Sequence, residues 1–89
     1  MHAVVVRVKI NDPDPAREML TSGVVPQVSA APGFQAGYWT WDDGGSNGLS
    51  MVIFDTEDNA RATADRVSDM VNDAVSVESV EVREVVASA

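Results

Sequence analysis

The residues best suited to binding or chemistry gather in one segment, GYWTWDDGGSNG at positions 37–48. Tyr38, Trp39 and Trp41 make up three of the five aromatic residues of the chain. Their rings could line an apolar pocket, and the Tyr38 hydroxyl could hydrogen-bond to a ligand. His2, the only histidine, could accept a proton, since an unperturbed imidazole titrates near pH 6.5.

The same residues also suit purely structural roles. Trp39 and Trp41 could fill a core or a protein interface, where Trp is enriched. His2 shares its parity with Val4 and Val6, so an ordered strand would place it at the end of an apolar face. The sequence leaves both interpretations open.

The loop DDGGSNG has acidic and small residues at alternating positions, which invites comparison with a calcium-binding loop. Asp43, Asn47 and Gly48 match its first, fifth and sixth positions. Gly45 fails the third position, and Phe54 stands where the bidentate Glu is required. The chain also lacks Cys, a phosphate-binding Gly loop and a G-x-S-x-G nucleophile motif. We therefore expect no metal site and no cofactor.

Length and charge narrow the classes of partner. The 89 residues predict one domain spanning positions 1–89. The net charge is −8 and the six basic residues are scattered, which argues against nucleic acid and anionic membranes as partners. No apolar stretch approaches the roughly 20 residues of a membrane span. With no Cys and no basic region leading an apolar run at the N-terminus, we expect a cytoplasmic protein.

The first half of the chain predicts a strand, a helix and a second strand. Residues 3–10 alternate as a strand with one strongly apolar face. Asp14 and Pro15 are expected as N-cap and first helical residue. Pro26 lies within the helical pattern and predicts a kink or break near Val25.

The second strand runs from 34 or 35 to 41, with Ala36, Tyr38 and Thr40 on one face and Gly37, Trp39 and Trp41 on the other. Residues 42–48 suit a hairpin connection.

The second half predicts a strand, a helix and a final strand. Residues 49–55 are apolar on both faces, which is typical of a strand covered on both sides. Asp55-Thr56 offers an N-cap for a helix over residues 57–73. In the last strand, 75–86, the apolar phase changes near Ser79, which predicts a β-bulge or a bend.

The resulting order, β-α-β-β-α-β, predicts an α+β protein of the ferredoxin-like arrangement: an antiparallel four-stranded sheet with two helices on one face. Helices can cover only that face, yet the second and third strands carry large apolar residues on both. Soluble monomers generally avoid an exposed apolar patch of that kind. We therefore expect a homodimer in which two sheets face each other.

Two segments, VVPQVSAAPGFQAGYWTWDD and GLSMVIFDTEDNARA, carry a resemblance to a known family. Their distinctive features are Pro32-Gly33-Phe34 at the close of the first helix, the aromatic strand after it, and Phe54-Asp55 before an Ala-rich helix. Over residues 3–86 the chain resembles the dimeric α+β barrel superfamily and, within it, the antibiotic-biosynthesis-monooxygenase-like (ABM-like) proteins.

The resemblance implies a dimeric α+β barrel and one possible activity. Oxygenases of that family oxidise phenolic, polyketide-like substrates with O₂ and without metal or flavin. By that resemblance Trp39, Trp41, Met51 and Phe54 would bind the substrate, and His2 and Tyr38 would be the catalytic groups. The family's haem-degrading members carry a haem-ligating His on the second helix, where this chain has none.

No polar constellation in the sequence decides whether the protein is an enzyme. We expect a small dimeric protein that binds a small apolar or aromatic molecule or acts as a non-catalytic module. The alternative is a cofactor-independent monooxygenase.

Overall fold

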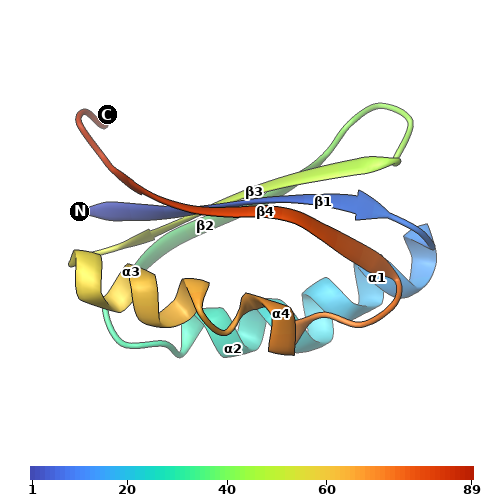
Figure 1. Ribbon diagram of the computed structural model, residues 1–89, viewed down its shortest axis with the longest axis horizontal. Helices are drawn as coiled ribbons and strands as arrows, with labels where there is room; N and C mark the ends of the chain where they lie inside the picture. The colour runs from blue at the N-terminus through green and yellow to red at the C-terminus, as the bar shows by residue number, and fades with distance from the viewer.

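Four strands form one antiparallel sheet, and every helix lies on the same face of it (Figure 1). The computed structural model describes residues 1–89. The elements are β1 (His2–Ile10), α1 (Pro13–Met19), a π-helical turn η1 (Leu20–Val24), α2 (Val25–Ser29), β2 (Phe34–Trp41), β3 (Asn47–Phe54), α3 (Glu57–Ala64), α4 (Val67–Met70) and β4 (Val75–Glu84). The strand order is β2-β3-β1-β4, and the α+β architecture is consistent with a ferredoxin-like fold. None of the helices has the length and apolar character needed to cross a bilayer.

The first helical segment starts earlier than the sequence suggested. The N-cap is Asp12, not Asp14, and its side chain makes no capping hydrogen bond. The backbone N–H of Ala16 donates to the Asp12 carbonyl at 3.0 Å, which starts the helix at Pro13. Pro13 and Pro15 then both lie in the first turn. Backbone N–H groups there have no intrahelical acceptor, so the missing N–H of proline costs no hydrogen bond. Two Asp-Pro pairs in succession made the choice of cap ambiguous.

The kink or break expected near Val25 takes the form of a π-helical turn, and the backbone stays helical from Pro13 to Ser29. Helix α1 ends at Met19, and a new α-helix begins at Val25 after the five-residue π-helical turn. The N–H of Val25 donates to the Leu20 carbonyl, five residues back. Pro26 has no N–H to donate, so the regular ladder cannot continue through it.

The second helical segment is shorter than expected. Of the predicted Asp55-Thr56 pair, Thr56 is the N-cap, and its hydroxyl accepts from the Asn59 N–H at 3.2 Å. The continuous helix expected over 57–73 is wrong, because α3 ends at Ala64 and only the short α4 follows. A turn closed by the Arg66 N–H on the Thr63 carbonyl at 3.0 Å separates the two helices.

The strands take the faces that their alternation predicted. In β2, Trp39 pairs with Ser50 and Tyr38 with Met51, so the Trp and Tyr side chains leave the sheet on opposite sides. The bulge in β4 is confirmed, since the register with β1 shifts where Glu78 is inserted between Val77 and Ser79. This insertion explains why the apolar phase of β4 changes.

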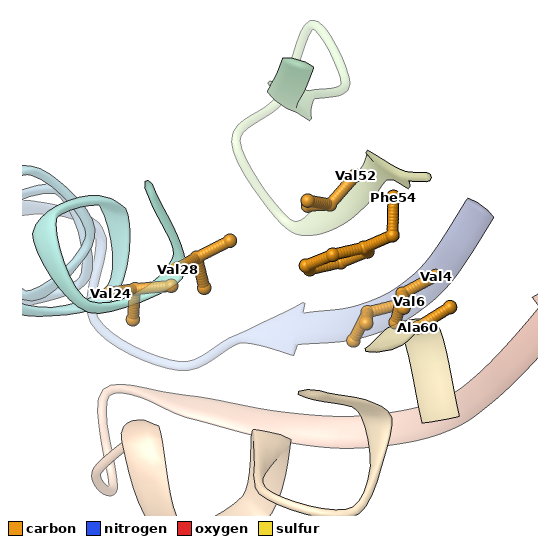
Figure 2. Close-up of a cluster of buried hydrophobic side chains, with 7 residues drawn as sticks. All are labelled: Val4, Val6, Val24, Val28, Val52, Phe54 and Ala60. Carbon is orange, nitrogen blue, oxygen red and sulfur yellow. The ribbon is translucent and has the colours of Figure 1, made fainter. Parts of the chain in front are cut away.

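The main core lies between the sheet and the helices. Phe54 is fully buried, and its ring meets Phe34 edge-on with 6.3 Å between centroids. Figure 2 shows the Phe54 ring extending from β3 toward Val28 of α2, across the space beneath Val52. The buried members of the cluster are Val4, Val6, Val24, Val28, Val52, Phe54 and Ala60.

The opposite face of the sheet, which we call the open face, carries no helix (Figure 1). Tyr38, Leu49 and Met51 lie there, and all three are exposed. The third strand is therefore covered on one face only within a single chain.

Candidate functional site

An apolar cavity of about 70 Å³ lies between the helices and the sheet. Fifteen of its nineteen lining residues are hydrophobic, so its contents must be mainly apolar. Strand β2 contributes Trp39 and Trp41, and the helical segments contribute the two methionines Met19 and Met70. Strand β1 of the same sheet contributes Val4, Val6 and Val8. We call this space the tryptophan cavity.

Two glycines make room for the tryptophan rings. A Cβ on Gly37 would lie 2.8 Å from Cη2 of Trp39, so the ring packs over a position that can carry no side chain. A Cβ on Gly48 would lie 2.8 Å from a Val8 methyl and 3.5 Å from the ring of Trp41. Gly48 pairs with Trp41 across the β2–β3 ladder, so its lack of a side chain lets Trp41 and Val8 approach.

The π-helical turn forms the helical wall of the cavity. Leu20 and Val24, its first and last residues, both line the space. Single π-turns inside helices are often found at functional sites. Here the turn presents two apolar side chains to the cavity at the point where Pro26 interrupts the regular helix.

The cavity offers few polar groups and none that titrates. The polar side chains on its side of the sheet are the hydroxyls of Ser50 and Thr63. Thr40 shares the open face with Tyr38, and its hydroxyl donates to the Leu49 carbonyl at 2.6 Å. Without a carboxylate, imidazole or phenol in its lining, the tryptophan cavity has no general acid or base of its own.

His2 lies away from this cavity, at the start of β1. Its Nε2 is 3.6 Å from Glu57 Oε1, and its Nδ1 is buried without a hydrogen-bond partner. Arg61 Nε donates to the other oxygen of Glu57 at 2.7 Å. That hydrogen bond and charge lower the pKa of Glu57, with a smaller contribution from His2. The arrangement joins the start of β1 to the start of α3.

The six residues proposed from the sequence divide into four groups. Trp39 and Trp41 line the cavity together. Phe54 belongs to the adjoining core and does not line it. Tyr38 and Met51 are paired on the open face with exposures of 67% and 44%. His2 lies beside Glu57.

The hairpin between β2 and β3 is held by one carboxylate. Asp42 accepts hydrogen bonds from the side chain of Asn47 at 3.1 Å and from the backbone N–H groups of Asn47 and Ser46 at 3.2 and 2.9 Å. These bonds, led by that of the Asn47 side chain, lower the pKa of Asp42. The loop thus fixes the register that directs both tryptophans to the helix-covered face.

Sequence reasoning missed one polar neighbour of the cavity, Arg17. Its guanidinium carbon lies 4.8 Å from the centre of the Trp41 ring, in a cation–π arrangement. A single exposed Arg on a helix carries no sequence signal of such a contact.

Neither the search for a metal centre nor the comparison with known proteins gave a match. No group of three or more His, Asp or Glu side chains is arranged to hold a metal ion. No model of a known protein family matches this chain, and no curated protein matches it.

Proposed function

We propose that the protein is a homodimeric module of the dimeric α+β barrel type that binds a small apolar or aromatic molecule without catalysing a reaction. The observation that carries this proposal is the tryptophan cavity, which combines two indole walls with an apolar lining and no titratable group. Ligand pockets are typically concave and lined by hydrophobic and aromatic side chains.

The size of the cavity limits what it can hold. About 70 Å³ is well below the several hundred Å³ of a drug-sized site, so the buried part of the ligand is a short chain or a single ring. Met19 and Met70 can enlarge the space, because methionine is unbranched and adapts its shape.

The dimer is proposed from the open face. Leu49 and Met51 of β3 and Tyr38 of β2 present exposed apolar surface there, while every helix lies on the other side (Figure 1). A second copy whose sheet covers this face would remove that surface from water. Light scattering at micromolar concentration should give twice the 9.5 kDa mass of the chain, and a mass near 9.5 kDa would refute the dimer.

The alternative, a cofactor-independent monooxygenase on phenolic substrates, finds no favourable observation. The two groups that would carry its chemistry, His2 and Tyr38, are not among the residues that line the cavity. Oxygen uptake by the protein in the presence of phenolic substrates would support the monooxygenase alternative.

Ligand binding can be tested with the four methionine methyl groups as reporters. Met19 and Met70 line the cavity, whereas Met51 lies on the open face. Addition of toluene should shift the NMR signals of Met19 and Met70 and leave those of Met51 and Met1 unchanged. Equal shifts at Met51, or none at any methionine, would contradict a ligand site in this cavity.

A blocking variant provides a second test. Val67→Phe should fill the cavity from α4 and abolish the shifts. Val86→Phe, at a residue 87% exposed beyond the end of β4, is the matched control and should leave them intact.

A further inference from the structure

A surface groove adjoins the tryptophan cavity beside the edge strand β2. It has a volume of about 300 Å³ and is lined by Arg17, Leu20, Thr21, Val25, Trp39 and Trp41. Leu20 and the two tryptophans also line the cavity, so one set of side chains separates the two spaces. A ligand that reaches the cavity past these three side chains would have its outer end in the groove.

Arg17 is the only charged residue of that groove. None of the ion pairs of the chain involves it, whereas Arg61 and Arg83 are each paired with a carboxylate. The guanidinium carbon lies over the Trp41 ring, 4.8 Å from its centre, and the Arg17 N–H groups donate no side-chain hydrogen bond within the chain. Such donors match the two oxygens of a carboxylate.

The remaining groove residues offer a ligand no second charged group and no free hydroxyl proton. The Thr21 hydroxyl has its proton directed to the carbonyls of Arg17 and Glu18, at 3.0 and 3.3 Å. Leu20, Val25 and the indole walls are mainly apolar. A free cation at one end of a site and an apolar cavity at the other define an amphiphilic ligand.

We propose that the ligand of the tryptophan cavity is a small organic anion, whose short chain or single ring enters the cavity while Arg17 binds its carboxylate in the groove. The inference rests on the proposed function and adds the chemical class of the ligand. A chain of net charge −8 repels an anion at long range, so its binding must come from the local cation.

The test compares hydrocinnamate with its neutral amide, which has the same ring and chain. Because both tryptophans of the chain lie at this site, their fluorescence reports binding here alone. The wild type should bind the carboxylate about tenfold more tightly than the amide at low salt. Arg17→Gln should remove this preference, and Arg66→Gln, which removes the same charge from a residue outside the groove, should retain it.

The ratio of the two dissociation constants within each variant decides the outcome, so a general loss of affinity does not affect the comparison. Equal binding of acid and amide by the wild type would overturn the assignment of an anion, while leaving the proposed cavity function in place. An undiminished preference in Arg17→Gln would overturn the role of Arg17. Failure of both compounds to bind would overturn this inference and the proposed function together.

Discussion

The two faces of the sheet are built from the same strands and have opposite characters. On the helix-covered face, Trp39 and Trp41 line a cavity beside the buried Phe54. On the open face, Tyr38 and Met51 from the same two strands are exposed. Successive residues of one aromatic strand thus line an internal cavity and an external surface.

This division follows from the two-residue period of a strand. Tyr38 lies between Gly37 and Trp39 in the sequence, yet neither shares its face. The aromatic segment therefore has two separate roles, and a substitution in it should affect one face at a time. Variants with a substitution on one face can test that separation. The largest loss of stability is expected for a substitution in the core.

Removal of the Phe54 ring should cost the most stability. Phe54→Ala deletes a fully buried ring and its edge-on contact with Phe34, which should lower the free energy of unfolding by about 3–5 kcal/mol. That is a large part of the stability of a domain of this size.

Met51→Ala, on the same strand but the open face, should lower the free energy of unfolding by less. Its cost should depend on protein concentration, because in the proposed dimer the Met51 side chain packs against the second copy. Urea denaturation at two protein concentrations measures both. An equal, concentration-independent loss of stability in the two variants would refute the separation of the faces.

A charge on the open face should break the dimer and spare the cavity. Met51→Glu would bury a carboxylate between the two sheets, and an unpaired buried charge costs several kcal/mol. We expect dimer affinity to fall by about a hundredfold or more. Gln27→Glu adds the same charge to an exposed position of α2 and should leave the dimer intact. Light scattering reports the mass, and toluene-induced shifts of Met19 report the cavity. A dimeric Met51→Glu variant would mean that the open face is not the interface.

A methyl group at Gly37 should disturb the cavity side alone. The added Cβ would lie 2.8–2.9 Å from the Trp39 ring, so the ring must move. Overpacking of this kind costs roughly 1–3 kcal/mol. Gly44→Ala is the matched control, because its Cβ would meet only the Ser46 hydroxyl at 3.6 Å. Tryptophan emission and urea denaturation should change in the first variant and not in the second. Unchanged emission from Gly37→Ala would show that Trp39 does not pack over this glycine.

Much of this arrangement was predictable because it depends on local periodicity. The alternation in β2 assigned Tyr38 and Trp39 to opposite faces, and the phase change in β4 predicted an irregularity near Ser79, next to the inserted Glu78. Thr56 was recognised as a cap because an extended hydroxyl residue precedes a helical pattern.

The features that the sequence did not predict depend on contacts between distant elements. Alternation separates the two faces of β2 but does not say which one the helices cover. The stacking of Arg17 on Trp41 joins a helix and a strand that are far apart in the chain. The interruption after Ala64 has no Gly or Pro to announce it, so the apolar spacing suggested one continuous helix.

The smallest predicted effect concerns the carboxylate that holds the β2–β3 hairpin. The hydrogen bonds from Asn47 and Ser46 lower the pKa of Asp42 in the folded protein. The ionised form therefore stabilises the fold above the pKa of the unfolded chain, near 4, and this contribution is lost as the pH falls through the lower folded value. Asp42→Asn should weaken stability slightly at neutral pH and flatten its decline in acid. Asp43→Asn removes the same charge from the same loop without removing those hydrogen bonds.

Denaturant unfolding between about pH 2 and pH 7 measures the difference between these two variants. Identical pH profiles for Asp42→Asn and the wild type would show that the Asp42 bonds contribute nothing to stability. Although Asp42 should change the stability only slightly, the hairpin register matters for the two faces. A slip of one residue in the hairpin would turn Trp39 and Trp41 to the open face. A weakened loop that still pairs Trp41 with Gly48 would show that packing of the tryptophans against the helices is sufficient to hold the register.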